Sequence, residues 1–352
     1  MRRVGVFPGK FAPPHRGHIE AILKCGCQCD KLYVVVSHDD KSDSQLYKDT
    51  PTKPITFKQK VKWLSQELSD LAHIEVIGLD ESNIDVYPHG WEPWSRLLRE
   101  AIPEPFHVIF GGEAEYAEHG YNKYFPDCRY EIFSRVKVGY PITATEIRKN
   151  PYANWEYILG VAREHFVKKV LITGTESCGK TTLTKMLAKT FFTSWAQEEG
   201  RYYSAKNFGG NETVFEPKDF YNICWEQKQA EDHAIRNANK IVFFDTDAVV
   251  TQFYCKLYLG EQNPAIDLLL DPYRYNLIIF LQPDIPWVDD GMRQHRDAEK
   301  RWELHKVLYN MYQLRGFAPR LISVNGNYAE RFNEALRLSQ KLLTGYKCKI
   351  RC

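Results

Sequence analysis

Twice along the chain, short apolar segments alternate with longer amphipathic segments, and this alternation constrains the fold more than any other feature of the sequence. In the first half, the segments that we expect to form strands are Val4–Phe7, Leu32–Ser37, Ile74–Gly78, His107–Phe110 and Tyr130–Phe133. Helical spacing of apolar residues lies between several of them, at His15–Lys24, Thr56–Leu71 and Trp91–Ala101. Strands joined through helices of this length predict βαβ crossovers and a parallel sheet covered on both faces.

The same pattern restarts near residue 170. Its expected strands are Val170–Thr173, Ile241–Asp245, Leu277–Gln282 and Leu321–Val324. Its expected helices are Lys180–Thr190, Glu216–Asn237, Arg301–Arg315 and Ala329–Leu343. A further short strand is expected at Phe191–Ala196. We interpret the polar, glycine-bearing region Gly200–Pro217 as a mobile loop near a substrate.

These two series predict an α/β protein of two domains, each a mainly parallel sheet flanked by helices. The length of 352 residues agrees, because domains usually hold about 100–200 residues. Asn150-Pro151 marks the boundary, since proline ends the preceding element, and Trp155–Phe166 has the pattern of a connecting helix. We therefore expect domains at residues 1–150 and 168–352, with a linker helix at 151–167.

Composition excludes several classes of protein. The 47 basic and 45 acidic side chains leave a net charge of +2, which argues against nucleic acid as the main partner. No segment reaches the roughly 18 apolar residues of a membrane helix, and the start lacks the pattern of a signal peptide. Nine scattered cysteines indicate no disulfide framework. We expect a cytoplasmic protein without nucleic-acid or membrane partners, and nothing in the sequence argues against a homo-oligomer.

A glycine-containing segment directly follows the first expected strand and reads G-K-F-A-P-P-H-R-G-H. Gly9 lets a phosphate approach the backbone, and the helix that starts near His15 offers its N–H groups. His15 and His18 lie three residues apart on one helical face, where both can donate to phosphate oxygens. A metal site would need further ligands nearby, and none is obvious. We expect an anion site that includes Gly9, Lys10, Phe11, His15 and His18.

A second segment, Ile142–Arg148, reads I-T-A-T-E-I-R. The hydroxyls of Thr143 and Thr145, followed by Arg148 at a helix start, suit a second anion-binding turn. Together the two segments resemble the two signatures of the nucleotidyltransferase superfamily, with Thr143 in place of the usual serine. The resemblance implies that His15 and His18 contact the phosphates of ATP, that Lys10 and Arg148 also bind phosphate, and that Mg²⁺ bridges the leaving pyrophosphate.

Two tryptophans, Trp91 and Trp94, begin an expected helix between these segments. Either could stack on an aromatic ring of the acceptor, especially a cationic ring such as nicotinamide. Either could equally hold its helix against the core of the domain. The sequence leaves both interpretations open.

The second series opens with a phosphate-binding turn. After Val170–Thr173 the chain reads G-T-E-S-C-G-K-T, the pattern of a P-loop between a strand and a helix. Lys180 should reach the β- and γ-phosphates of ATP, and Thr181 should offer its hydroxyl to Mg²⁺. The residues expected to bind the nucleotide are Gly174, Ser177, Cys178, Gly179, Lys180, Thr181 and Thr182.

Carboxylates follow two of the strands in this half. Asp245 ends an apolar strand as a Walker B residue does, which makes it the second expected magnesium-side residue. Asp247 either binds substrate hydroxyls or caps the next helix. Glu198 is our first candidate to accept a proton from a substrate hydroxyl, with Glu199 as the alternative and Arg201 beside them. A solvated charge pair is the simpler reading of the two glutamates.

Three arginines follow the strand at Leu277–Gln282, namely Arg293, Arg296 and Arg301. Their spacing suits a lid that closes over ATP, and it also suits a solvated basic helix face.

Several segments of the chain together resemble a narrower family. The segment P-D-I-P-W-V-D-D-G-x-R at Pro283–Arg293, the D-T-D at Asp245–Asp247 and the E-x-G-R at Glu198–Arg201 resemble the ribosylnicotinamide kinase domain of NadR-type proteins. The W-E-x-W at Trp91–Trp94 and the I-T-A-T-E-I-R segment look like the adenylyltransferase domain of the same proteins. The resemblance extends from Val4 to about Leu343.

The NadR-type resemblance implies a bifunctional transferase of NAD salvage. The P-loop kinase domain would phosphorylate nicotinamide riboside to nicotinamide mononucleotide (NMN), and the Rossmann-like nucleotidyltransferase domain would join NMN to the adenylyl group of ATP, giving NAD and pyrophosphate. Both steps would use Mg²⁺ with ATP. Some members begin with a helix-turn-helix domain, for which we expect no room before Gly9. The alternatives are a fusion that acts on another metabolite, a regulator that senses ATP and NAD with little turnover, and a chain with one active domain.

Overall fold

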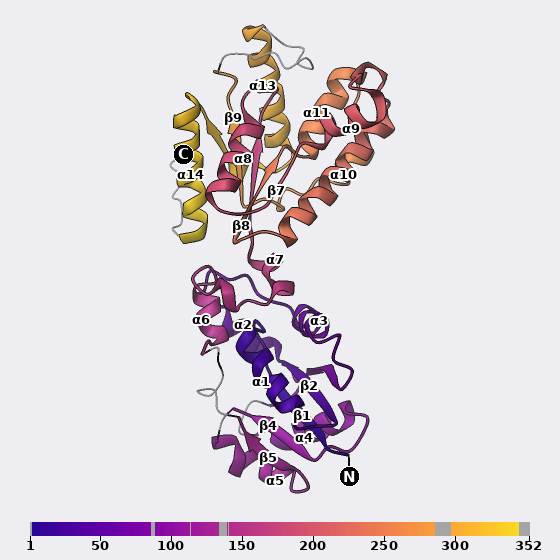
Figure 1. Ribbon diagram of the computed structural model, residues 1–352, viewed down its shortest axis with the longest axis vertical. Coiled ribbons are helices and arrows are strands. Elements are labelled where there is room, and N and C mark those ends of the chain that lie inside the picture. The colour runs from indigo at the N-terminus through magenta and orange to yellow at the C-terminus, as the bar shows by residue number, and fades with distance from the viewer. Residues whose placement is uncertain are drawn as a thin grey trace. The chain divides into compact units, whose positions relative to one another are not determined.

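The chain divides into two compact units, Met1–Phe166 and Val167–Cys352, each built on one sheet (Figure 1). The computed structural model describes residues 2–85, 89–112, 114–133, 139, 141–285 and 297–344. Every strand pair in both sheets is parallel. The predicted fold class is therefore confirmed. Within the described ranges, no helix is both long and apolar enough to cross a membrane.

The sheet of the first unit has the order β3-β2-β1-β4-β5. Its strands are β1 (Val4–Gly9), β2 (Lys31–His38), β3 (Ile74–Asp80), β4 (Val108–Gly111) and β5 (Arg129–Ile132). The chain builds outward from β1 to β3 and then returns to the other side of β1, where Gly5 pairs with Leu32 on one side and with Val108 on the other. In open α/β sheets, ligands bind at the carboxyl ends of the strands where the order reverses, which places the candidate site at the end of β1.

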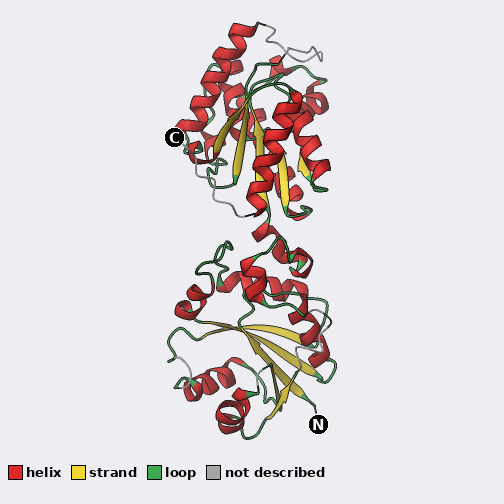
Figure 2. Ribbon diagram, turned by 90° about the vertical axis from the view of Figure 1, so that its left-hand side faces the viewer, coloured by secondary structure: helices red, strands yellow, loops and turns green. Residues whose placement is uncertain are grey.

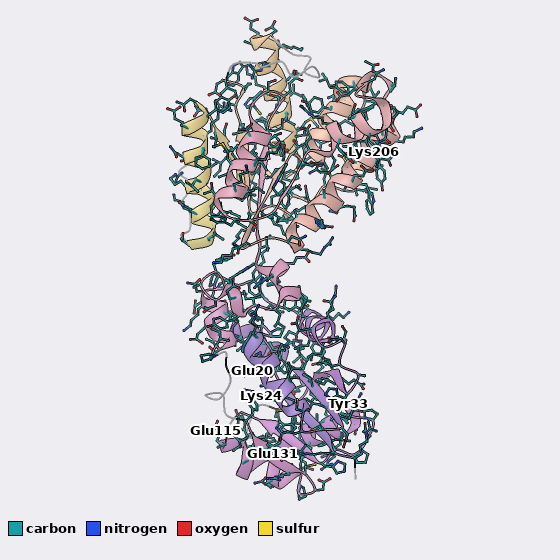
Figure 3. All side chains as sticks on the ribbon, in the orientation of Figure 1. Glu20, Lys24, Tyr33, Glu115, Glu131 and Lys206 are labelled. Atoms are coloured by element: carbon teal, nitrogen blue, oxygen red, sulfur yellow. The ribbon has the colours of Figure 1, made fainter. Side chains whose placement is uncertain are left out.

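Helices cover both faces of this sheet (Figure 2). They are α1 (Arg16–Gly26), α2 (Asp40–Leu46), α3 (Phe57–Glu67), α4 (Trp91–Ala101), α5 (Asn122–Tyr124) and α6 (Ala144–Lys149). Val34 and Val36 face α1 and α3, whereas Tyr33 and Val35 face α4, because successive side chains of a strand point to opposite faces. On the exposed side of α1, Lys24 donates to Glu20 at 2.5 Å (Figure 3).

The sheet of the second unit has the order β10-β9-β6-β8-β7. Its strands are β6 (Lys168–Thr173), β7 (Trp195–Ala196), β8 (Ile241–Asp245), β9 (Leu277–Leu281) and β10 (Leu321–Val324). Its helices are α8 (Lys180–Thr190), α9 (Glu199–Phe208), α10 (Pro217–Arg236), α11 (Ala248–Leu259), α12 (Pro264–Asp267), α13 (Ala298–Leu314) and α14 (Tyr328–Thr344). The P-loop leaves the central strand β6, between the neighbours β8 and β9.

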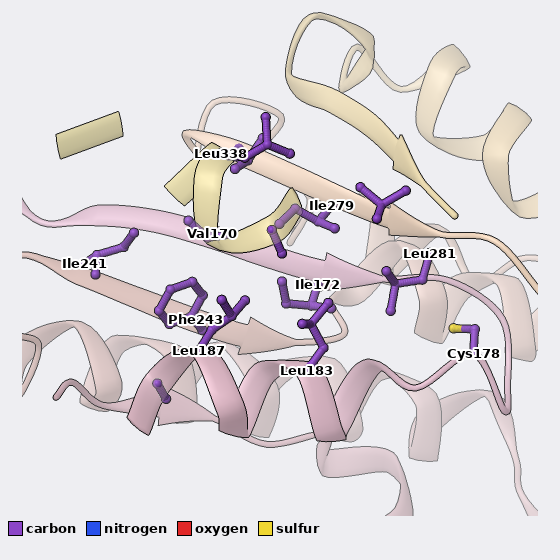
Figure 4. Close-up of a cluster of buried hydrophobic side chains, with 14 residues drawn as sticks. Val170, Ile172, Cys178, Leu183, Leu187, Ile241, Phe243, Ile279, Leu281 and Leu338 are labelled. Carbon is purple, nitrogen blue, oxygen red and sulfur yellow. The ribbon is translucent and has the colours of Figure 1, made fainter. Parts of the chain in front are cut away.

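One face of this sheet packs against α8 and α14 (Figure 4). Ile172 and Phe243 pack with Leu183 and Leu187 of α8 in a cluster of buried hydrophobic side chains. On the opposite face, Phe280 contacts the rings of α13. The helix that follows the P-loop is thus fixed by apolar burial along its length.

Two sequence expectations about the connections are wrong. The segment expected as one helix at Trp155–Phe166 forms two 3₁₀ turns, Trp155–Tyr157 and Gly160–Ala162, and then the short helix α7 (Arg163–Phe166). Trp155, Ile158 and Leu159 are buried and have the i, i+3, i+4 spacing of a helix, so the sequence pattern did not reveal the break. The backbone of Ile158 and Leu159 is not helical, and Ile158 pairs with His15 in an isolated bridge.

The region Gly200–Pro217 is not one continuous loop, because its whole first half lies in α9. The apolar side of α9 packs with Phe215 and Phe220 in a small separate cluster. Burial of Tyr203 in that cluster stabilises a helix that the composition of the segment did not indicate.

We predict that Leu187→Ala lowers the free energy of unfolding of the second unit by about 2–5 kcal/mol, because it leaves a cavity where the side chain has no exposed surface. Met186→Ala is the matched control. This neighbour on α8 is 41% exposed, so its truncation should change the free energy by no more than about 0.5 kcal/mol. Denaturant unfolding of both variants measures the difference, and equal losses would contradict the packing described here.

Candidate active sites

The loop between β1 and α1 forms the floor of the first site. Phe11 adopts a φ of 47°, which is rare for a residue with a side chain, and its ring is buried. The ring lies 6.2 Å from that of Phe7 and meets the edge of His18 at 5.0 Å between centroids. Phe11 therefore turns the chain sharply after Gly9 and supports the first histidine-bearing turn of α1.

The two predicted histidines lie together at the N-terminus of α1. His15 is the N-cap residue, and its Nδ1 accepts from the backbone N–H of His18 at 3.3 Å. The two rings stack with centroids 3.6 Å apart. Because Nδ1 of His15 accepts, the proton of a neutral ring lies on Nε2, which can donate to an anion. Two imidazoles at the positive end of a helix make this position suitable for phosphate oxygens.

Lys10 lies at the same edge of the sheet, near Asp43 at 3.4 Å, and it also contacts Ser42. Asp43 is buried and accepts from Lys60 Nζ at 2.7 Å, with His38 Nδ1 at 2.9 Å. Burial alone would raise the pKa of Asp43, but its hydrogen bonds with Lys60 and His38 lower it. Asp43 and Lys60 were not predicted as site residues, because no helix was expected at α2 and a lysine on α3 gave no sign of burial.

Arg148 does not hold an open guanidinium toward a phosphate in this structure. It is buried, its Nε donates to the carbonyl of Leu46 at 2.9 Å, and its Nη1 contacts the carbonyl of Ala12. Its Nη2 donates to Thr145 at 2.9 Å, while Thr143 caps α6. Burial lowers the pKa of Arg148. The second segment thus supports the loop of the first.

Trp91 and Trp94 belong to an aromatic cluster under α4. Their rings meet edge to face at 5.6 Å, and Trp94 Nε1 donates to Glu81 at 2.6 Å. Trp91 contacts Tyr121 at 5.0 Å and lies parallel to Tyr124 at 6.3 Å. Of the two interpretations, the structure shows the one in which the tryptophans anchor the helix. Both indoles are only half-buried, so each keeps some exposed surface.

The P-loop of the second unit adopts the conformation that its sequence predicts. Gly174, Ser177 and Gly179 have φ values of 143°, 58° and 86°. A Cβ atom at Gly174 would lie 2.7 Å from the carbonyl oxygen of Leu281, so only glycine fits there. Lys180 is buried and donates to the carbonyl of Thr175 at 2.9 Å.

Two buried arginines hold the outer side of this loop. Arg301 donates to the carbonyls of Ile285 at 3.1 Å and Ser177 at 3.4 Å. Arg331, on α14, donates to the carbonyls of Cys178 at 2.6 Å and Gln282 at 2.8 Å. Arg301 is thus one of the three predicted lid arginines and contacts the P-loop itself. Arg293 and Arg296 lie outside the described residues.

Asp245 faces the P-loop. Thr181 Oγ1 donates to Asp245 Oδ2 at 2.5 Å, while Oδ1 is buried and has no hydrogen-bond partner among the described residues. Burial and the charge of Glu198 raise the pKa of Asp245 to about 6. Burial alone would lower the pKa of Lys180, but Glu198 and Asp245 are among the groups that raise it. An orphaned carboxylate oxygen beside a threonine hydroxyl fits the oxygen ligands that Mg²⁺ prefers.

A cleft opens beside these groups. Glu198 and Arg201 line it together with Lys180, Thr181 and Thr182. Glu199 does not line it: the side chain is buried, and its backbone N–H donates to Gln227 Oε1 at 3.0 Å. The geometry therefore favours Glu198 over Glu199 as the group that can reach a substrate.

Asp247 caps a helix, which is the second of its two predicted roles. Its Oδ1 accepts from the N–H groups of Val249 at 3.2 Å and Val250 at 3.4 Å, and from the hydroxyl of Tyr312 at 2.5 Å. Burial raises its pKa to about 7. Asp247 does not line the cleft, so we no longer place it among the substrate contacts.

The far wall of the cleft holds residues that the sequence analysis missed. Tyr254 and Tyr258 of α11 line it, and the hydroxyl of Tyr258 donates to Glu212 Oε2 at 2.9 Å. The apolar ring of Phe215 lies on the same wall. Two tyrosines four residues apart on one helical face were the available signal, but α11 itself was not expected.

Comparisons with known proteins agree with this geometry. The family described as "AAA domain" matches residues 169–331. The "Trifunctional NAD biosynthesis/regulator protein NadR" of Escherichia coli (strain K12) is 35% identical over 321 residues, which cover 89% of this chain and 77% of that protein. Two crystal structures of NadR protein, one in complex with NR and one with NAD and AMP-PNP, are 27% identical with TM-scores of 0.81 and 0.80. Each match covers 100% of this chain and 99% of the other.

We predict that Asp245→Asn raises the thermal stability of the protein without nucleotide or divalent cation at about pH 8. The raised pKa means that the folded state binds a proton more tightly than the unfolded state. The carboxyl therefore costs stability as the pH rises from about 4 to about 6, and this cost persists above that range. The advantage of the asparagine should shrink as the pH falls through the same window, as followed by thermal melts. A difference in melting temperature that does not change with pH would contradict the raised pKa of Asp245.

Proposed function

Because the chain belongs to the NadR family, we propose that its two sites perform successive ATP-dependent steps on a pyridine nucleoside. The protein is a bifunctional transferase of NAD salvage. In our scheme the second unit phosphorylates nicotinamide riboside to NMN, and the first unit joins NMN to the adenylyl group of ATP, releasing pyrophosphate. The observation that best supports the kinase step is one cleft. Lys180 and Glu198 line it together with Tyr254 and Tyr258.

In the kinase step, the backbone N–H groups of the P-loop and Lys180 hold the β- and γ-phosphates. Glu198 accepts the proton of the 5′-hydroxyl of the riboside. The 5′-oxygen then bonds to the γ-phosphorus of ATP, and the bond between that phosphorus and the oxygen of ADP breaks. Mg²⁺, held by Thr181 and Asp245, would neutralise charge on the phosphates. The orphaned oxygen of Asp245 supports this site. Rate enhancement then comes from positioning and charge stabilisation.

The pyridinium ring of the riboside carries a positive charge, and the far wall of the cleft suits such a ring. Tyr254 and Tyr258 line the cleft, and the face of an aromatic ring attracts cations. The carboxyl group of Glu212, which accepts from Tyr258, lies on the same wall. We assign this wall to the pyridine end of the acceptor and the P-loop to ATP.

In the adenylyl-transfer step, a phosphate oxygen of NMN attacks the α-phosphorus of ATP, and pyrophosphate leaves. His15 and His18 donate to the phosphates as charge builds in the transition state. Lys10 joins them from its position near Asp43. Arg148 positions the loop through the carbonyl of Ala12. The exposed parts of Trp91 and Trp94 remain our candidates for contact with the nicotinamide ring.

The use of Mg²⁺ in both steps belongs to this proposal, as does a cytoplasmic location. ATP as the substrate of both units supports that location, and so do the cysteines of the described residues, all of which are free thiols.

We predict that Lys180→Ala abolishes phosphorylation of nicotinamide riboside and leaves adenylylation of NMN within a few-fold of the wild type. The lysine is a P-loop residue of the second unit, so its loss should not alter the first site. Lys189→Ala, an exposed position on the same helix, is the control and should retain both activities. Coupled assays of ADP and pyrophosphate release measure the two steps, and a parallel fall of both would overturn the assignment of separate sites.

The reciprocal prediction concerns His18→Ala. Loss of one donor to the phosphates should lower kcat for NAD formation from NMN by about 10²–10³-fold. Riboside phosphorylation by the same preparation serves as the internal control and should be unchanged. An adenylylation rate within a few-fold of the wild type would exclude His18 from the reaction.

A further inference from the structure

Thr246 combines two unfavourable features at the wall of the kinase cleft. Its φ of 73° places a β-branched residue in the left-handed region, where such residues are genuine outliers. Its side chain is 4% exposed, and its Oγ1 is buried without a hydrogen-bond partner among the described residues. Both features cost free energy in a ligand-free protein, and residues in such conformations cluster at functional sites.

The backbone around Thr246 is held from two sides. Its N–H donates to the carbonyl of Ile172 on β6 at 3.0 Å, and its carbonyl accepts from Gln227 Nε2 at 3.4 Å. The same glutamine, through Oε1, accepts from the N–H of Glu199 at 3.0 Å. Gln227 therefore ties the turn of Thr246 to the start of α9, where Glu198 enters the cleft.

The charges around Thr246 indicate which ligand its hydroxyl suits. Asp245 precedes it in the chain, and the charges that act on Asp245 are those of Glu198, Lys180 and Arg201. Two carboxylates and two cations leave no net positive charge that would favour a phosphate oxygen, whereas a neutral hydroxyl of a ligand needs none. It can also donate and accept, which matches a threonine hydroxyl in either direction.

We infer that the hydroxyl of Thr246 hydrogen-bonds a sugar hydroxyl of the riboside acceptor and so supplies the partner that the protein withholds. This inference rests on the proposed kinase function. It adds a substrate-binding residue next to the magnesium-side residue Asp245, in the cleft that Glu198 also lines.

Thr246→Val tests the inference, because valine keeps the shape and the β-branch and removes only the hydroxyl. The KM for nicotinamide riboside should rise about three- to tenfold, as expected for one lost hydrogen bond, while the KM for ATP stays unchanged. The ligand-free variant should melt at the same temperature as the wild type or higher, because it no longer buries an unpartnered hydroxyl. Thr246→Ser keeps the hydroxyl and should retain the wild-type KM for the riboside.

Deoxy analogues of nicotinamide riboside identify the partner. Inhibition constants of the 2′-, 3′- and 5′-deoxy compounds are measured against wild type and Thr246→Val. The analogue that lacks the partner should bind both proteins equally, whereas the other two should lose affinity for the variant. Equal losses for all three analogues overturn the inference, as does an increase of KM for ATP alone. If the wild type fails to phosphorylate nicotinamide riboside, the proposed function is wrong and this inference falls with it.

Discussion

Both candidate sites depend on one constraint. A loop whose backbone N–H groups point toward a phosphate must point its carbonyl groups away from that phosphate. Those carbonyls point into the protein, where each needs a donor. Buried guanidinium groups supply them: Arg148 contacts the carbonyl of Ala12, Arg301 that of Ser177 and Arg331 that of Cys178. Arginine suits this task because its planar group reaches several carbonyls from one position and stays charged when buried. Buried arginines behind each loop thus hold the backbone that faces the candidate anion site.

The two units differ in the surroundings of their buried aspartates, and the pKa values of these aspartates shift in opposite directions. In the first, the carboxylate of Asp43 meets Lys60, His38 and Lys10, and the pKa of Asp43 is lowered. In the second, burial and the charge of Glu198 raise the pKa of Asp245, although Lys180 and Arg201 oppose the increase. The first cluster is complete within the protein. In the second, Asp245 Oδ1 has no hydrogen-bond partner among the described residues, so it is available to a divalent cation of the kind that the proposed kinase function needs.

Sequence patterns predicted the strands and the phosphate loops well, because both depend on local chemistry. The strand Ile241–Asp245 and the helix Lys180–Thr190 have the predicted bounds, since apolar runs and glycine turns mark them. Roles that depend on tertiary burial were harder to predict. From the sequence, Arg148 was expected to bind phosphate. Its burial against the carbonyl of Ala12 was not predicted, because that contact joins residues far apart in the chain. Similarly, α9 owes its helix to packing against Phe215 and Phe220, which no local pattern reveals.

Lys10 illustrates a kinetic consequence of the Asp43 cluster. Lys60 and His38 already satisfy the buried carboxylate, so the contact with Lys10, which is long and exposed, can break without leaving a buried charge alone. Exposed side chains change rotamer within picoseconds to nanoseconds. In the proposed reaction, the lysine can therefore follow a phosphate group faster than a chemical step, and its release from Asp43 needs no movement of the backbone.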